Sequence, residues 1–197
     1  MKKQVIVIYG GDSFETYEKF LDALKNWEVS LETFLPKYDW KSKLLMNLGD
    51  KYEILAPRMP NKQNAKYEEW KIWFGRMIPF VKDNVVLIGH SLGGLFLAKY
   101  LSENKFPKKI KALFLVAAPH SQTKDIGNFK LKKDLQKVRE QCQNIHLYQS
   151  EDDPLVAASE AQEYQKSWPE AKLHIFPDRG HFNQKSFPEL VREINRS

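Results

Sequence analysis

The stretch Val85-Val86-Leu87-Ile88-Gly89-His90-Ser91-Leu92-Gly93-Gly94 decides the fold. Its first four residues are apolar and mostly β-branched, which predicts a buried strand, and the apolar positions after Gly94 predict a helix. A G-x-S-x-G serine between a strand and a helix is typical of a nucleophile elbow, where the backbone is strained and neighbouring chain passes too close for side chains. The alternative is a structural serine in a tight turn. A catalytic interpretation therefore requires a base and an acid further along the chain, in the right order.

Composition indicates one soluble globular domain. The chain has 197 residues, of which 42% are hydrophobic and 28% charged, which is enough for a sizeable core. No apolar run approaches the roughly 18 residues that span a bilayer. The N-terminal apolar run, Val5 to Tyr9, is too short for a signal peptide and is interpreted as the first strand. Cys142 is the single cysteine, which excludes an intrachain disulfide and favours a reducing, cytoplasmic location.

The formal charge of +6 raises the question of nucleic-acid binding. Lysines and arginines are spread along the chain, and the densest group, within 130–139, alternates with Asp134 and Glu140. That pattern is typical of the solvated face of a helix, so no nucleic-acid partner and no membrane span are expected. The sequence leaves the oligomeric state open.

Strand-like and helix-like segments alternate along the whole chain. Apolar runs predict strands at 3–10, 51–56, 85–88, 111–117, 145–149 and 172–176. Helical spacing predicts helices from a capping box at Asp12 and Glu15 to about 27, and over 40–48, 65–81, 92–104, 131–142, 156–168 and 187–196. The prediction is therefore an α/β fold: a three-layer α/β/α sandwich with a mainly parallel sheet of about six strands.

Polar residues follow the ends of these strands, where ligands gather in an open parallel sheet. The serine needs a base, and His181, in the loop after the last strand, is the favoured one of five histidines. His90 is expected to point away from Ser91 and to pack. His146 and His174 lie inside strands and are interpreted as structural, and His120 is a weaker candidate that could line the pocket.

Asp152 and Asp153 are adjacent, so both cannot face the histidine equally. Asp153 precedes the proline that fixes the exit turn and is favoured as the acid, which leaves Asp152 to brace the loop. The order Ser91, Asp153, His181, with spacings of 62 and 28 residues, matches the order in α/β-hydrolases.

The segments GHSLGG, DDPLV and GHFN together resemble the α/β-hydrolase superfamily, and within it the compact serine hydrolases that include the retinoblastoma-binding serine hydrolase. The resemblance covers Val5 to about Val191. It implies that Ser91 is the nucleophile, Asp153 the orienting acid and His181 the base. The implied oxyanion donors are the backbone N–H groups of Leu92 and Gly11.

The chain departs from that family at two places. Tyr9-Gly10 replaces the usual His-Gly of the first loop, and Asp12 to Asp39 is an apparent insertion directly after it. The insertion carries several aromatic residues and is predicted either to form a small cap over the pocket or to be a surface helix that fills a groove.

These observations predict a serine hydrolase that cleaves a carboxylic ester or related acyl bond of a small molecule. No metal or organic cofactor is implied. An ordinary imidazole titrates near pH 6.5, so activity is expected to rise between about pH 6 and 8. The competing class is a non-catalytic α/β-hydrolase domain that binds a protein or metabolite, although such a module has no need to keep all three triad residues.

Overall fold

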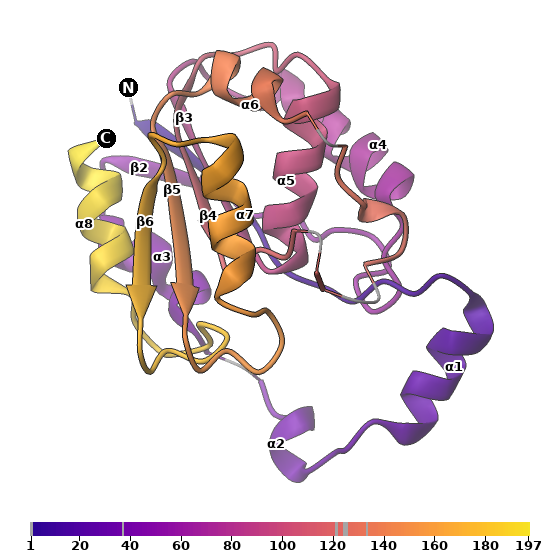
Figure 1. Ribbon diagram of the computed structural model, residues 1–197. Helices are drawn as coiled ribbons and strands as arrows, with labels where there is room; N and C mark the ends of the chain where they lie inside the picture. Colours follow the sequence, from indigo (N-terminus) through magenta and orange to yellow (C-terminus); the bar gives the residue numbers. More distant parts are fainter. Residues whose placement is uncertain (1, 37, 121, 124–125, 133) are drawn as a thin grey trace.

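The computed structural model describes residues 2–36, 38–120, 122–123, 126–132 and 134–197. Their strands form one parallel sheet in the order β2-β1-β3-β4-β5-β6 (Figure 1). The strands are β1 (Lys3–Ile8), β2 (Tyr52–Leu55), β3 (Val85–His90), β4 (Ile110–Val116), β5 (Ile145–Ser150) and β6 (Lys172–Phe176). The predicted parallel α/β architecture is confirmed.

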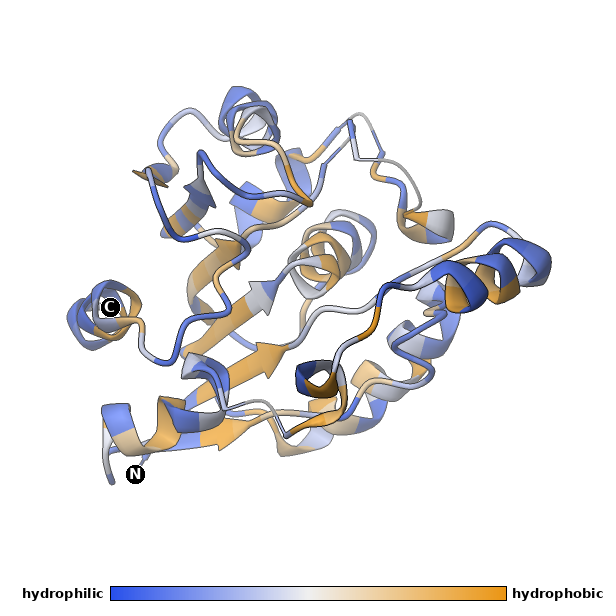
Figure 2. Ribbon diagram, turned by 90° about the horizontal axis from the view of Figure 1, so that it is seen from below, coloured by the Kyte–Doolittle hydropathy of each residue, from blue (hydrophilic) through white to orange (hydrophobic). Residues whose placement is uncertain are grey.

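Helices cover both faces of the sheet. One face packs against α4 (Tyr67–Met77), α5 (Leu92–Glu103), α6 (Gln136–Gln141) and α7 (Ser159–Ser167), and the other against α3 (Trp40–Leu48) and α8 (Pro188–Arg196). Two short 3₁₀ turns, η1 (Ile78–Phe80) and η2 (Gly127–Phe129), complete the first layer. Figure 2 looks onto the carboxyl edge of the sheet, with apolar strands between the two helical layers.

The alternation of side chains along β1 explains why its whole run is apolar. Ile6 and Ile8 belong to the core on the α5 side, whereas Val5 and Val7 belong to the core on the α3 and α8 side. All four side chains are fully buried. Burial of one such side chain contributes roughly 1.5–3 kcal/mol, so a strand covered on both faces gains from every position.

Three predicted helices are shorter in the structure. The helix predicted over 131–142 begins only at Gln136, where the Asp134 carboxylate accepts a hydrogen bond from the Gln136 amide. The lysine-rich stretch before it is therefore loop rather than helix face, and Lys133 lies outside the described residues. The helix predicted from Val156 begins at Ser159, and the helix predicted from Ala65 begins at Tyr67.

The predicted capping box at Asp12 and Glu15 is wrong. The first helix, α1 (Tyr17–Asn26), is capped by Thr16, whose hydroxyl accepts from the Lys19 amide. The segment before it is held extended instead, because the Asp12 amide donates to the Lys62 carbonyl and the Ser13 hydroxyl donates to the Ala65 carbonyl.

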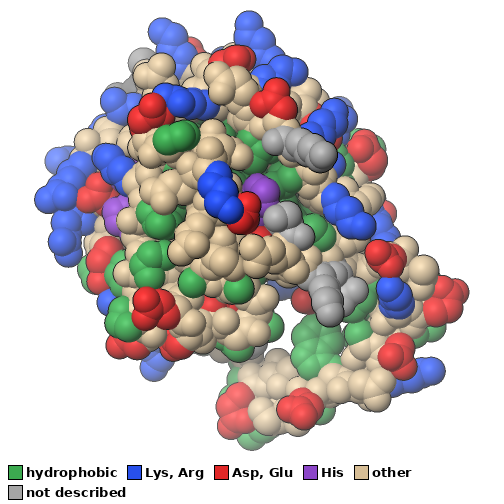
Figure 3. Space-filling model, in the orientation of Figure 1, with side chains coloured by type: hydrophobic (Ala, Val, Ile, Leu, Met, Phe, Trp, Pro, Cys, Tyr) green, Lys and Arg blue, Asp and Glu red, His purple; other side chains and the backbone are tan. Residues whose placement is uncertain are grey.

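The insertion at 12–39 extends away from the rest of the molecule. It holds α1 and the one-turn helix α2 (Leu31–Phe34), and neither helix has a buried residue. Both lie apart from the helical layers in Figure 1, and Figure 3 shows open space between this segment and the body.

Of the helices that the structure describes, none combines the length and the apolar character needed to cross a lipid bilayer.

Candidate active site

Ser91 lies in a strained turn between β3 and α5. Its backbone has φ 54° and ψ −129°, a conformation that a non-glycine residue adopts only where the surroundings enforce it. A side chain on Gly89 would meet the backbone of Gly94, and one on Gly93 would meet the Ile8 carbonyl. The glycines of the motif are therefore required by the close passage of β1 and α5, which places the Ser91 hydroxyl at the carboxyl edge of the sheet.

The loop after β1 lies directly beside Ser91. A Cβ on Gly10 would lie 2.8 Å from the Ser91 Cβ, so only glycine fits there. Leu92 opens α5, and its N–H is among the first amides of the helix, which have no carbonyl partner within it. Tyr9, which replaces the family's histidine, packs against the core on the α3 side.

The structure brings Asp153 and His181 together. His181 Nδ1 lies 2.9 Å from Asp153 Oδ2 and 3.1 Å from Oδ1. The Asp153 side chain is 0% exposed, and its Oδ1 also accepts hydrogen bonds from the Leu155 and Val156 amides. These bonds hold the carboxylate in one orientation, so the Nδ1–H of His181 points at Asp153 and Nε2 is left for another partner.

Asp152 holds the loop of His181 rather than its ring. Asp152 Oδ1 accepts from the Ser150 hydroxyl at 2.6 Å and from the Gly180 amide at 2.7 Å. The same Ser150 oxygen accepts from the Arg179 amide. The adjacent aspartates thus face different parts of one loop.

His90 also holds His181, which the sequence did not indicate. His90 Nε2 donates to the His181 carbonyl at 2.8 Å, and the two rings are 5.0 Å apart. Burial, with the positive charges of Lys41 and His181, holds the pKa of His90 well below 6.5. A neutral ring has one N–H to donate, so His90 ties the residue beside the elbow serine to the loop after β6.

Ser91 and His181 therefore lie in neighbouring segments, although the described residues include no hydrogen-bond partner for the Ser91 hydroxyl. Asp12, directly after Gly11, is a further titratable side chain near this site. Loss of hydration raises the pKa of its carboxyl, and attraction to His181 and Lys62 offsets part of that rise.

The remaining histidines are occupied elsewhere. His146 and His174, on β5 and β6, hydrogen-bond to each other at 3.2 Å inside a stack of aromatic rings. His120 contacts the Tyr164 ring edge-on at 4.7 Å. Burial lowers the pKa of all three.

Glu160 is a second feature that the sequence did not indicate. Its side chain at the start of α7 is fully buried, and its carboxylate accepts hydrogen bonds from the amides of His120, Gln122 and Thr123. The carboxylate therefore shapes the loop after β4. A lone glutamate in a polar helix carries no sequence signal for this role, because its partners lie about 40 residues earlier.

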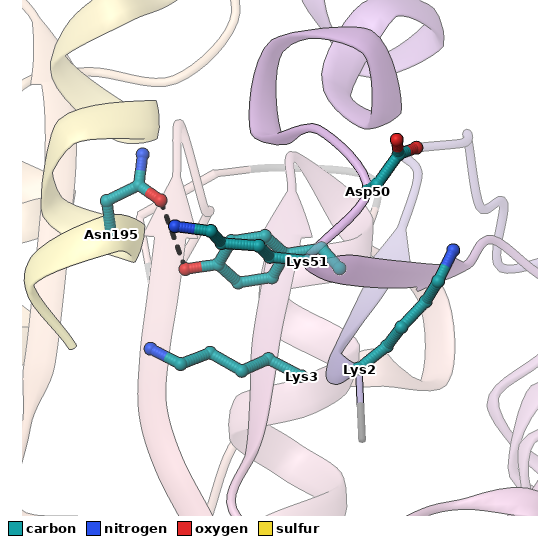
Figure 4. Close-up of a pocket in the computed structure, with 6 residues that line it drawn as sticks. Lys2, Lys3, Asp50, Lys51 and Asn195 are labelled. Carbon is teal, nitrogen blue, oxygen red and sulfur yellow. Dashed lines mark hydrogen bonds between the residues drawn. The ribbon is translucent and has the colours of Figure 1, made fainter.

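A solvent-open cavity lies away from this site. It has a volume of about 590 Å³ and is open to solvent at the amino end of the sheet, between β1, β2 and α8 (Figure 4). Figure 4 shows Lys2, Lys3 and Lys51 at this cavity. Tyr52 also lines it, and the Tyr52 hydroxyl donates to Asn195. The catalytic candidates are at the opposite edge, so this cavity is not the candidate active site.

Residues 36–191 match the serine hydrolase family. The chain belongs to the serine hydrolase family. The serine hydrolase RBBP9 of Rattus norvegicus is 30% identical over 168 residues, which cover 80% of this chain and 83% of that protein.

Other relatives of this serine hydrolase are more distant. The putative hydrolase YdeN of Bacillus subtilis is 25% identical over 92% of this chain and 87% of its own. The solved structure of the ydeN gene product has a TM-score of 0.74 at 20% identity and covers 99% of this chain and 98% of its own. The Pyrococcus furiosus esterase Pf2001 has a TM-score of 0.59 at 18% identity, with 99% of this chain and 81% of its own covered. The structural likenesses show the α/β-hydrolase fold.

Proposed function

We propose that this serine hydrolase cleaves a carboxylic ester or a related acyl bond of a small molecule through a Ser91-His181-Asp153 triad. The observation that carries the proposal is the hydrogen bond between the imidazole and a buried carboxylate beside a serine with an enforced φ of 54°. Nothing in a structural turn requires that combination. The name of the Pyrococcus relative, an esterase, points to the same bond class.

The proposed reaction proceeds by acyl transfer. The Ser91 oxygen attacks the substrate carbonyl while its proton passes to His181 Nε2. The backbone N–H groups of Leu92 and Gly11 stabilise the oxyanion. The intermediate then expels the alcohol, which takes the proton from His181. Water, deprotonated by His181, hydrolyses the acyl-enzyme, releases the carboxylic acid and restores Ser91.

Asp153 acts by holding the imidazole in one tautomer and stabilising its charged form. Its fixed carboxylate accepts the Nδ1–H, which leaves Nε2 to exchange protons with the serine. We also propose a reducing, cytoplasmic setting, because the single cysteine, Cys142, is free and buried and forms no disulfide.

A fluorophosphonate probe tests the proposal directly. We expect the wild-type protein and Ser42→Ala, which removes an exposed hydroxyl on α3, to be labelled, and Ser91→Ala to remain unlabelled. Turnover of p-nitrophenyl esters of increasing chain length then identifies the preferred acyl group. A folded wild-type protein that neither labels nor hydrolyses any ester would favour the alternative, a binding module with the same fold.

A further inference from the structure

The insertion at residues 12–39, here called the arm, exposes an unusual amount of apolar surface. Single exposed apolar residues are common, but monomeric proteins rarely expose contiguous apolar patches beyond a few hundred Å². The exposed large side chains of the arm are Tyr17, Leu21, Leu24, Trp27, Val29, Leu31, Phe34, Leu35 and Tyr38, with exposed fractions from 37% to 74%. Such a surface indicates a contact with another molecule.

The arm helices are too short to stand alone. α1 has ten residues and α2 has four, and helices shorter than about 12–15 residues are marginal in water without packing. Tyr17, Leu21 and Leu24 recur at helical spacing and form one apolar face of α1. Tyr17 lines a pocket with body residues between 61 and 69, but it remains 61% exposed, and Leu21 and Leu24 are 37% and 45% exposed. Most of this face is therefore left for a partner from outside the chain.

The charge of the arm indicates what kind of partner fits. Residues 12–39 contain seven acidic and three basic side chains, a net charge of −4 in a chain of +6, so the remainder carries +10. This charge disfavours contact with an anionic lipid surface and also disfavours contact between two arms. It favours the basic body of a second copy of the same chain.

The body also exposes large apolar side chains, and three of them lie on or just after α4. Ile72 is 67% exposed and Trp73 48%, both on one face of α4, and Phe80 at the end of η1 is 72% exposed. Arg76 is exposed one turn after Ile72. We call these four residues the α4 surface. Large aromatic side chains beside an arginine are the composition enriched at the energetic centres of interfaces.

We propose that the arm of one copy docks on the α4 surface of a second copy, and that the exchange is reciprocal. Both ends of the arm are fixed to its own body, by the Ser13 hydrogen bond to Ala65 and by the Trp40 Nε1 hydrogen bond to the Phe182 carbonyl. The arm is thus a tethered loop that presents its apolar side chains outward. Two copies that exchange arms form a closed two-fold dimer.

Directed cross-linking tests the contact. A tagged Glu32→Cys chain is mixed with an untagged Arg76→Cys chain under mild oxidation, while buried Cys142 stays unreactive. We expect a disulfide between tagged and untagged chains. Disulfides mainly between two Glu32→Cys chains would overturn the placement and show arm-to-arm contact.

Sedimentation velocity over a concentration series measures the dimer itself. We expect Phe34→Ser on the arm and Trp73→Ser on the α4 surface each to raise the dimer dissociation constant about tenfold or more. Met46→Ser, which changes an exposed apolar residue on α3 outside the proposed contact, is expected to change it less than about twofold.

A protein that stays monomeric at every concentration overturns the proposal. Hydrogen exchange of the α1 amides then identifies the alternative. Protection in the monomer shows that the arm closes over its own body as a cap, whereas rapid exchange shows an uncovered arm. Because neither measurement depends on hydrolysis, failure here leaves the proposed catalytic function untouched.

Discussion

Two adjacent aspartates differ in what their carboxylates face, although their side chains are chemically identical. Asp153 accepts the imidazole N–H of His181, and Asp152 accepts the backbone N–H of Gly180 in the same loop. One therefore acts on the ring that exchanges protons and the other on the chain that carries it. The pair offers a matched comparison within one loop.

We expect Asp153→Asn to lower kcat for a p-nitrophenyl ester by about 10³–10⁴, because an amide no longer fixes the imidazole tautomer. Asp152→Asn keeps an oxygen acceptor for Gly180 and is expected to lower kcat by less than about tenfold. Stopped-flow or steady-state assays on both variants, with circular dichroism as a folding control, make the comparison. Equal losses in the two variants would contradict the assignment of Asp153.

The histidine pair inside the sheet gives the protein a pH-dependent stability. Burial, then the charge of Lys172, lowers the pKa of His146 to about 4, and burial also lowers the pKa of His174. The neutral His146 ring donates from Nε2 to Asn144 and accepts at Nδ1 from His174. A proton on Nδ1 would break that contact.

The unfolded chain binds this proton near pH 6.5 and the folded chain only near pH 4. The stability that depends on a neutral His146 is therefore fully present above pH 6.5. As the pH falls toward 4, the free energy of unfolding decreases by about 2–3 kcal/mol. Urea unfolding at pH 7.5 and pH 5 measures it. His146→Gln keeps hydrogen-bonding groups but does not titrate, so the stability of this variant should differ less between pH 7.5 and pH 5 than that of the wild type. An equal difference in the two proteins would show that another group causes the pH dependence.

At the scale of elements, α7 organises the loop after β4 through a single side chain. Glu160 supplies two carboxylate oxygens to the amides of His120, Gln122 and Thr123. Glu160→Gln replaces one acceptor oxygen with a donor, which leaves a buried amide unpaired at a cost of about 1–3 kcal/mol. Chemical denaturation measures the loss. Glu163 lies three residues after Glu160 on α7 and accepts a hydrogen bond from Lys166. Glu163→Gln should leave the unfolding midpoint unchanged, and a similar fall in that variant would indicate a general charge effect.

Elements with strong local signals were predictable from the sequence. α3 occupies the predicted residues 40–48, because Asp39 caps its start and Gly49, with φ 73°, ends it. β6 also matches its predicted bounds. α6 and α7 begin later than predicted, since apolar spacing continues through loop residues whose backbone is held by side chains such as Asp134 and Asp153.

In the candidate site, too, some features were predictable from local sequence signals and others were not. The motif around Ser91 and the order of its partners are local signals, and they identified the aspartate and histidine that the structure brings into contact. The supports of that site are long-range contacts. His90 reaches a carbonyl 91 residues away, and no local pattern distinguishes it from a packing residue. The arm is the reverse case: its aromatic residues were visible in the sequence, but their exposure was not.

For the whole molecule, the exposure of the arm predicts that the body folds without it. Replacing residues 16–36 by a Gly-Ser linker of equal length keeps the anchors at Ser13 and Trp40 and removes both arm helices, which have no buried residue. The free energy of unfolding of the monomer should change by less than about 1 kcal/mol, because surface changes of this kind leave the core intact. Thermal and urea unfolding at low protein concentration check this.

Turnover of short and long esters by the same variant tests whether the arm is a cap over the active site. Unchanged activity and selectivity rule out a cap. If the wild-type protein is fully monomeric and the variant selectively loses turnover of long esters, the arm is a cap.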